Sequence, residues 1–413
     1  VRSRNSIAGV LANSLAEATV QNPKLLSDLV NQADTVVITA LLEAEKCFDP
    51  VPREAAARLI QQFGNEGPVP VLLIKETRNP DVAIRKQAVK HLGDLKEPSL
   101  LPTYESILKD KNESAGVLYN VIIALEQLKG EPIIPALKLA TQTNVAQVRT
   151  HAAKLLGLLK AEDAITDLIR LLADSNDYVK NSAINALIEI GEPTINPLIA
   201  VLDSKAQNVI PDKNPDFVNQ YQYIANVYID TARLESRRIS TQAAAIQVLG
   251  SLKARAAISR LINLFENDDL RGSASAALTA IAGVAVPDVI QALQDTRDDI
   301  RIQSTGVLNT IGDPRATEPL IEVLKSDPRK EVKASAAQAL GNMKAYGLNN
   351  GAIEPLTQAL TLDDTTAANA ATALGQIKIG SNQANQRLMA IALDKRGRET
   401  VRSAALFALS QLK

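Results

Sequence analysis

The side chains that most often perform catalysis or bind metal ions are scarce in this sequence. Among 413 residues there are two histidines, His91 and His151, and one cysteine, Cys47. A Ser-His-Asp triad or a histidine-rich metal site has little material here. A lone cysteine beside an apolar helical run is typical of buried packing, with a reactive thiol as the alternative. We therefore predict no catalytic residues, no metal site and no cofactor, and we interpret both histidines as ordinary surface or groove residues.

Cationic side chains, in contrast, recur at one fixed place. Each follows an apolar residue at the start of a short, alanine-rich segment, and a ladder of such cations would suit an acidic partner. The alternative is that the cations hold the structure together, and we favour that interpretation. The residues concerned are Arg85, Arg149, Lys180, Arg271, Arg301, Lys333 and Arg402.

The segments that carry these cations are copies of one repeating unit. The frame "VKASAAQALGNM" (332–343) reappears as "IRKQAVKHLGDL" (84–95), "VRTHAAKLLGLL" (148–159) and "VRSAALFALSQL" (401–412), and a weak copy, "PREAAARLIQQF", spans 52–63. The spacing predicts about eleven units of roughly 31 residues, one of them degenerate. A unit of this size is one supersecondary element that must stack on its neighbours to bury its apolar face.

Two helices build each predicted unit. The first carries small residues on one face, which lets the next helix approach closely. The second, as in "TEPLIEVLKSD" (317–327), has apolar residues at spacings of three and four, as an amphipathic helix requires. We expect Asp177, Asp269 and Asp299 to cap first helices, and we expect single glycines to serve as left-handed caps at helix ends.

The V-R-x-x-A-A-x-A-L-G helix followed by a P-L-I-x-x-L helix resembles HEAT repeats, specifically the PBS-lyase HEAT-like type, over about residues 50–413. This resemblance implies an all-α, right-handed α-solenoid with the second helices on its concave face, and protein–protein recognition as its default role. It also implies bonds between adjacent repeats from an aspartate near the turn to the recurring cation. Asp177, Asp268 and Asp298, which lie three residues before Lys180, Arg271 and Arg301, are the candidates. Deoxyhypusine hydroxylase is similar too, but its iron-binding His-Glu dipeptides are absent because Leu92 and Ala152 follow the two histidines.

Composition narrows the partners further. The net charge is −1 and aromatic residues make up 3% of the chain, so a broad electrostatic grip on nucleic acid is not expected. No apolar run reaches the roughly 20 residues that span a bilayer, and no signal-peptide core follows the basic start. We expect a cytoplasmic protein, although the first residue is Val1 rather than Met, which leaves a removed upstream segment open.

The candidate binding surface is a stripe on the second helices. The residue after each Leu-Ile pair should face the concave side, and it varies while its surroundings stay constant. In a repeat protein, constant positions build the stack and variable exposed positions read the partner. A merely solvated stripe is the alternative. The stripe consists of Lys138, Arg170, Ala200, Asn263, Gln291, Glu322 and Gln358.

One region departs from the repeat. Residues 205–240 open with a proline-containing loop, continue as a helical run and concentrate aromatic residues, namely Phe217, Tyr221, Tyr223 and Tyr228. Tyrosine is enriched at interfaces, so this insertion is a second candidate contact; a degenerate repeat with aromatics filling the core is the alternative. We divide the chain into a helical N-terminal cap (1–50), repeats (51–204), the insertion (205–240) and further repeats (241–413).

Two functions follow from this interpretation. The first is a non-catalytic scaffold or adaptor that binds a partner protein on the concave face. The second rests on the resemblance alone and is a phycobilin lyase or a factor associated with phycobiliproteins, whose partner would be a phycobiliprotein or another large assembly.

Overall fold

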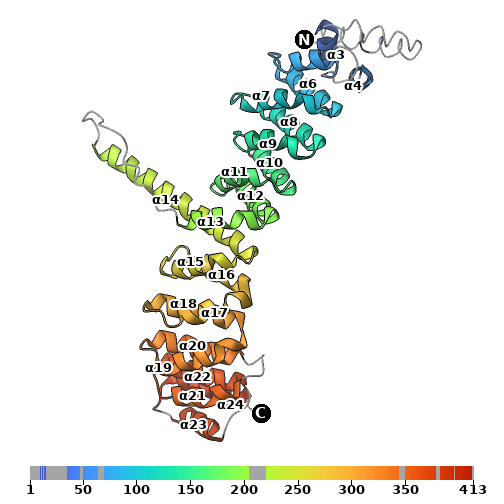
Figure 1. The fold of residues 1–413 in the computed structure, drawn as a ribbon. Coiled ribbons are helices and arrows are strands. Elements are labelled where there is room, and N and C mark those ends of the chain that lie inside the picture. The colour runs from blue at the N-terminus through green and yellow to red at the C-terminus, as the bar shows by residue number, and fades with distance from the viewer. Residues whose placement is uncertain are drawn as a thin grey trace. The chain divides into compact units, whose positions relative to one another are not determined.

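The computed structural model confirms that regularly spaced helix pairs build the chain (Figure 1). It describes Val10, Ala12, Ser14 and residues 35–46, 50–63, 69–203, 220–343, 349–377, 382–394 and 396–411, without the side chains of 220–234. Helix packing divides the chain into two compact units, Val1–Ile190 and Gly191–Lys413. Every described element is an α-helix or a short 3-10 helix.

In the first unit, each predicted copy of the repeat frame lies on a first helix. The second helices are shorter and follow each of these. Short 3-10 turns such as η1 (Pro98–Leu100) lead into most of the second helices. The first helices are α4 (Pro50–Phe63), α6 (Val82–Leu95), α8 (Ala115–Leu128), α10 (Ala146–Leu158) and α12 (Asp177–Ile190); the second helices are α5 (Val69–Glu76), α7 (Leu101–Lys109), α9 (Ile134–Ala140) and α11 (Ile165–Leu171).

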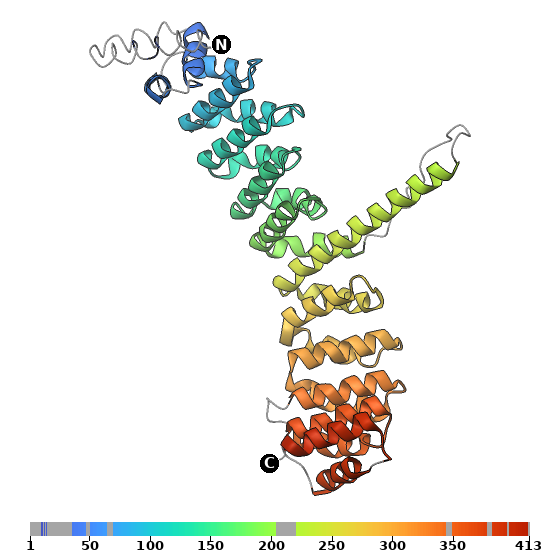
Figure 2. The same cartoon turned by 180° about the vertical axis from the view of Figure 1, so that it is seen from behind.

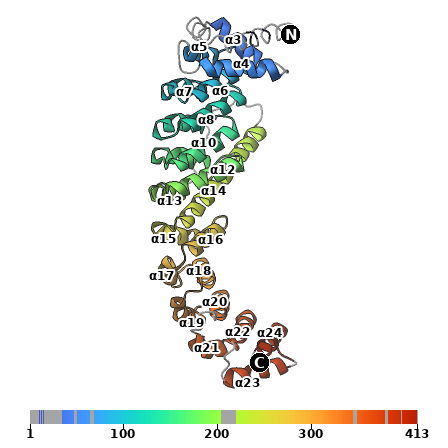
Figure 3. The same ribbon diagram turned by 90° about the vertical axis from the view of Figure 1, so that its right-hand side faces the viewer.

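The second unit repeats this arrangement in two layers. Figure 3 shows α15, α17 and α19 in one layer and α16, α18 and α20 in the other. The first helices are α14 (Gln220–Ser251), α16 (Arg271–Ile281), α18 (Asp298–Ile311), α20 (Lys330–Asn342), α22 (Asp364–Ile377) and α24 (Glu399–Gln411); the second helices are α13 (Ile195–Leu202), α15 (Ile258–Asn263), α17 (Val286–Ala292), α19 (Thr317–Ser326), α21 (Ile353–Ala359) and α23 (Asn382–Leu393).

Small residues bring successive first helices together, as predicted. Leu92, Leu156, Leu249 and Leu340, from the shared leucine position, are fully buried. The glycine after this leucine faces an alanine of the next first helix. A β-carbon built on Gly157 would lie 2.7 Å from Cα of Ala186. Glycine at this position therefore sets how closely two repeats pack.

These glycines correct one prediction. Gly93, Gly157, Gly250, Gly341 and Gly375 lie inside helices, at close helix contacts, rather than in left-handed caps. Only some of the single glycines have a cap role, as Gly312 does at the C-terminus of α18 with φ of 68°. Lysines such as Lys96 and Lys160 have positive φ instead at other helix ends.

The predicted N-terminal cap contains α3 (Thr35–Ala44), which packs on α4, α5 and α6. Polar contacts link this region to the first repeats: Thr39 donates to Glu76 over 3.0 Å, and Lys46 lies 2.6 Å from Asp81. Ile38, Leu41 and Leu42 are fully buried. Residues 1–9 and 15–34, the rest of the predicted cap up to α3, lie outside the described residues.

Candidate protein-binding surface

The predicted stripe lies on consecutive second helices, one residue on each of α9, α11, α13, α15, α17, α19 and α21. We call these residues the second-helix stripe. Lys138 is half-buried, and the other members are exposed. Their neighbours in the same helices are buried, as Leu320 and Leu324 are on either side of Glu322. The stripe therefore forms an accessible row on a packed layer within each unit.

In the first unit the stripe is basic but partly neutralised. Lys138 donates to the backbone oxygen of Asp163 over 2.9 Å and lies 3.7 Å from the Asp167 carboxylate. Arg170 pairs with the same carboxylate. Asp167 thus fixes both cations in place, because it holds one from its own helix and one from the preceding second helix.

In the second unit the stripe is neutral to acidic. Asn263 accepts a hydrogen bond of 3.2 Å from Arg297, and Gln358 donates to Glu354 over 3.0 Å. The side chains of Gln291 and Glu322 make no hydrogen bond or ion pair with any residue that the structure describes. The surface chemistry thus changes from one repeat to the next while the packing beneath it does not.

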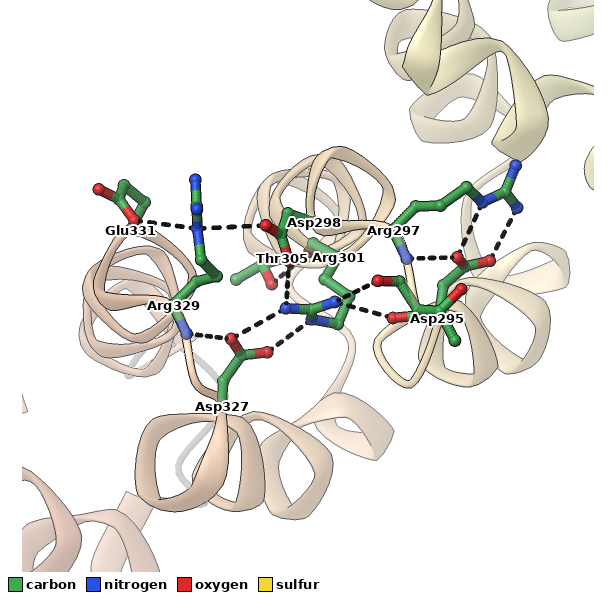
Figure 4. Close-up of polar contacts among 9 residues, drawn as sticks. Asp295, Arg297, Asp298, Arg301, Thr305, Asp327, Arg329 and Glu331 are labelled. Carbon is green, nitrogen blue, oxygen red and sulfur yellow. Dashed lines mark hydrogen bonds and ion pairs between the residues drawn. The ribbon is translucent and has the colours of Figure 1, made fainter.

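Three arginines of the cation ladder link successive repeats, and Arg301 on α18 shows how (Figure 4). Its guanidinium donates to the Asp327 carboxylate over 2.7 and 3.3 Å and to the backbone oxygen of Asp295 over 2.9 Å. The hydrogen bond to Asp327 raises the pKa of Arg301 above its usual range, although burial opposes the shift. Because Asp295 precedes α18 and Asp327 follows α19, one arginine joins the loops on both sides of its repeat.

Two arginines of the first unit make the same connection. Arg85 contacts Glu113 through two bonds of 2.9 Å and donates to the backbone oxygen of Asn79 over 2.8 Å. Arg149 contacts Asp174 over 2.7 and 2.9 Å. Burial raises the pKa of Glu113, but the interactions with Arg85 and Ser114 together outweigh burial, and the net shift is downward. Arg85, Arg149 and Arg301 therefore hold repeats together, whereas the side chains of Lys333 and Arg402 make no hydrogen bond or ion pair with a described residue.

The predicted aspartate partners form contacts of a different kind. Asp177, Asp268 and Asp298 do contact Lys180, Arg271 and Arg301, but from three residues earlier in the chain and near the start of the same first helix. The carboxylates that link successive repeats are Glu113, Asp174 and Asp327, which lie 28, 25 and 26 residues after their arginines. Sequence reasoning missed them, although an acidic residue four or five places before each next repeat frame was the available signal.

The predicted helix caps were also wrong. Asp177 is the first residue of α12, and Asn176 accepts from the backbone nitrogens of Tyr178 and Val179 instead. Asp269 and Asp299 do not cap their helices either, since Asn267 accepts from the nitrogen of Leu270 before α16, and α18 begins at Asp298. At α12 and α16 the accepting asparagine lies one or two positions earlier than the sequence suggested, whereas the N-cap residue of α18 is Arg297, which makes no side-chain cap bond.

The two histidines occupy different environments. His91 is buried and its Nε2 lies 2.7 Å from the Glu45 carboxylate, so its interpretation as a surface or groove residue was wrong. His151 is half-buried, and its Nε2 lies 3.1 Å from Glu126. Cys47 lies outside the described residues. No group of three or more metal-binding side chains exists within the part of the chain that the structure describes.

The aromatic insertion is only partly described. Phe217 lies outside the described residues, whereas Tyr221, Tyr223 and Tyr228 fall in the first half of α14, of whose side chains the structure says nothing. The helical run continues without a break into the first helix of the next repeat. Figure 2 shows that the first half of α14 extends away from the other helices of its unit.

Stacked helix pairs tied by arginines, with an exposed and variable second-helix layer, define an all-α solenoid of helical repeats. A family model described as HEAT repeats matches residues 69–150, 135–210, 266–341 and 317–410. The chain belongs to the HEAT-repeat family, as its sequence predicted. No described helix is both long and apolar enough to cross a membrane.

The chain is also similar to individual proteins. A stretch of 106 residues is 37% identical to phycocyanobilin lyase subunit beta of Nostoc sp. (strain PCC 7120 / SAG 25.82 / UTEX 2576), covering 25% of this chain and 53% of that protein. The chain thus matches about half the length of this curated relative. The match to a phycobilin lyase subunit agrees with the predicted repeat type, the PBS-lyase HEAT-like repeat.

Solved structures of helical-repeat proteins are similar as well. A chain in the structure of the complex of CpcE and CpcF of phycocyanin lyase from Nostoc sp. PCC7120 is 27% identical, with a TM-score of 0.34 over 37% of this chain and 98% of that chain. The karyopherin Kap121p bound to the extreme C-terminus of the protein phosphatase Cdc14p is 14% identical, with a TM-score of 0.48 over 98% of this chain and 48% of that chain.

Proposed function

We propose that this HEAT-repeat chain is a binding scaffold that recognises a partner protein through the second-helix stripe. The observation that carries the proposal is an exposed row whose residues change from repeat to repeat above a constant, buried frame. Packing explains why the frame is constant, but it places no demand on the stripe. Side chains that are variable, accessible and regularly spaced are suited to reading another protein surface.

The test begins with affinity purification from the native cell and mass spectrometry of the co-eluting proteins. The purified partner is then titrated against the wild-type chain and against a variant with Arg170→Ala and Glu322→Ala. Lys154→Ala together with Gln338→Ala is the matched control, because both residues are exposed on first helices. We expect the stripe variant to bind more weakly and the control to bind like wild type. Equal affinities for all three proteins would remove the stripe from the interface.

The first half of α14 is a second contact within the same proposal. It extends from its unit as a helix, and its sequence contains Tyr221, Tyr223 and Tyr228. Tyrosine supplies apolar area and a polar tip at an interface. Replacing the three tyrosines by alanine should weaken partner binding without changing the far-ultraviolet circular dichroism. An unchanged affinity would leave α14 as a structural extension only.

A second candidate function is a role with phycobiliproteins, as a lyase or an assembly factor. The observation that favours it is the 37% identity to phycocyanobilin lyase subunit beta. The test incubates the chain with phycocyanobilin and an apo-phycocyanin and follows pigment absorbance and gel filtration. A stable complex with the apoprotein, or faster pigment attachment, is the expected result. The absence of pigment binding, of complex formation and of pigment transfer would count decisively against this role.

A further inference from the structure

A groove of about 850 Å³ lies in the first unit, between α5 and α7 and the loops that follow them. Ile74 and Ile107 supply its apolar lining, while Thr103 and Ser106 add hydroxyl groups. Pro80 and Pro102 stiffen its walls, because proline fixes its own backbone angle. The groove adjoins the second-helix layer but contains none of the stripe residues named above.

The polar base of this groove is held rigidly and has no spare charge. Arg85 and Glu113 are bonded to each other, and their side chains are only 16% and 6% exposed. Arg85 also holds the backbone oxygen of Asn79, whose amide donates to Glu76 over 2.6 Å. These bonds fix both loops in one geometry, so a ligand would find the groove already formed. Preorganisation of this kind lowers the entropic cost of binding.

Two cationic side chains at the groove form no bond with the described residues around them. Arg78 lines the groove and is exposed, and its side chain makes no hydrogen bond or ion pair with any described residue. Lys111, in the loop from Asp110 to Glu113, is likewise exposed and has no such contact with a described residue. Asp110 is the one lining carboxylate outside the Arg85 pair, and it accepts from the backbone nitrogen of Asn112 over 2.9 Å. The charged residues that line the groove balance one another, so Lys111 beside it gives the groove and its rim together one net positive charge.

Arg78 differs in this respect from three loop arginines of the second unit. Arg297, Arg329 and Arg398 occupy loops between repeats, and each is paired with a carboxylate. The guanidinium of Arg78 presents its donors in a planar fork that matches a carboxylate. An exposed fork above an apolar lining is suited to a peptide that carries both an acidic and an aliphatic side chain.

We propose that this groove binds an acidic, extended segment of the partner protein, with a carboxylate on Arg78 and an aliphatic side chain against Ile74 and Ile107. The inference rests on the proposed scaffold function and names the chemistry of one partner segment. The groove lies wholly within the first unit, so the site requires no contribution from the second. Charge complementarity decides in favour of an acidic segment, since the base of the groove is neutral and its rim is cationic.

Fluorescence anisotropy of the full chain tests this inference with two short labelled peptides, one alternating leucine and glutamate and one alternating leucine and lysine. The wild-type chain should bind the glutamate peptide, with an affinity that falls as salt is added, and should not bind the lysine peptide. Arg78→Glu should weaken binding about tenfold or more, as expected for the loss of a charged hydrogen bond. Arg255→Glu is the matched control, because Arg255 is exposed in the second unit and its side chain makes no hydrogen bond or ion pair with a described residue.

Hydrogen exchange supplies a second readout that does not depend on the variant. The glutamate peptide should slow exchange at the C-terminal ends of α5 and α7 and leave α19 and α21 unchanged. Absence of binding, equal binding of the two peptides, or equal effects of the two variants would overturn the inference. If the native partner still binds Arg78→Glu but loses affinity for the stripe variant, the groove is wrong and the scaffold function stands.

Discussion

Replacing Gly341 by alanine should destabilise the second unit, although alanine is the better helix former. The new methyl group would lie 2.7 Å from both Cα and Cβ of Ala373 on α22. Ordinary carbon contacts begin near 3.5 Å, so the two first helices would have to separate. Overpacking of a core contact costs about 1–3 kcal/mol, and the helix propensity of alanine returns about 1 kcal/mol. We therefore expect a net loss of up to about 2 kcal/mol.

Gly306 provides the control for this prediction within the same unit. It lies in the middle of α18, is exposed, and has no atom within 4 Å of its virtual β-carbon. Gly306→Ala should therefore gain about 1 kcal/mol from helix propensity alone. The two substitutions are chemically identical. Opposite signs of the change in the free energy of unfolding would therefore isolate the effect of the contact between helices.

Hydrogen exchange with mass spectrometry is the appropriate assay because repeat proteins need not unfold in one step. Exchange in α20 and α22 should become faster, by up to about 30-fold, in Gly341→Ala, and exchange in α18 should become slower in Gly306→Ala. Slower exchange in both variants would refute the reasoning, because helix propensity would then outweigh the close contact.

Two further predictions concern the loops between repeats. Arg301→Met should cost about 3–5 kcal/mol because it leaves the buried Asp327 carboxylate without its cation. Arg260→Met removes an exposed pair with Asp203 and should cost no more than about 1 kcal/mol. Urea unfolding followed by circular dichroism compares the two variants, and similar midpoints would contradict a stabilising role for the bonds from Arg301 to Asp327. The hydrogen bond from Arg297 lowers the pKa of Asp295 from 3.8 to about 2, although burial opposes the shift. Because the folded pKa is the lower one, the stabilisation is present above about pH 4 and is lost as the pH falls toward 2. Asp295→Asn should remove this part of the acid sensitivity, and an unchanged pH profile would argue against it.

The repeat frame made most of the fold predictable. An apolar residue, a cation, small residues at helical spacing and a Leu-Gly pair recur in many copies, and the resulting first and second helices lie where the sequence places them. One unit cannot bury its apolar face alone, so every unit must keep the residues that pack on its neighbours, and these residues recur at a fixed spacing in the sequence. The same repetition separated the constant frame from the variable second-helix stripe.

Contacts that depend on loop geometry were harder to predict. The bond from Arg301 to Asp327 spans 26 residues and depends on where α19 ends, which no local pattern specifies. The burial of His91 was missed for a similar reason, because its partner Glu45 comes from a segment outside the repeat frame. The groove beside Arg78 has no sequence signature, since its lining comes from two helices and two loops.

The arginine and the glycine of one first helix together have a mechanical consequence. In α10, Arg149 fastens the loop edge and Gly157 seats against Ala186, and the two points are eight residues apart, or about 12 Å along the helix axis. A single attachment would act as a pivot, whereas two attachments along one axis oppose rotation of one repeat against the next. The packing of α10 on α12 should therefore resist twisting. One helix would rotate against the other only if either the Arg149 bond or the Gly157 contact were lost.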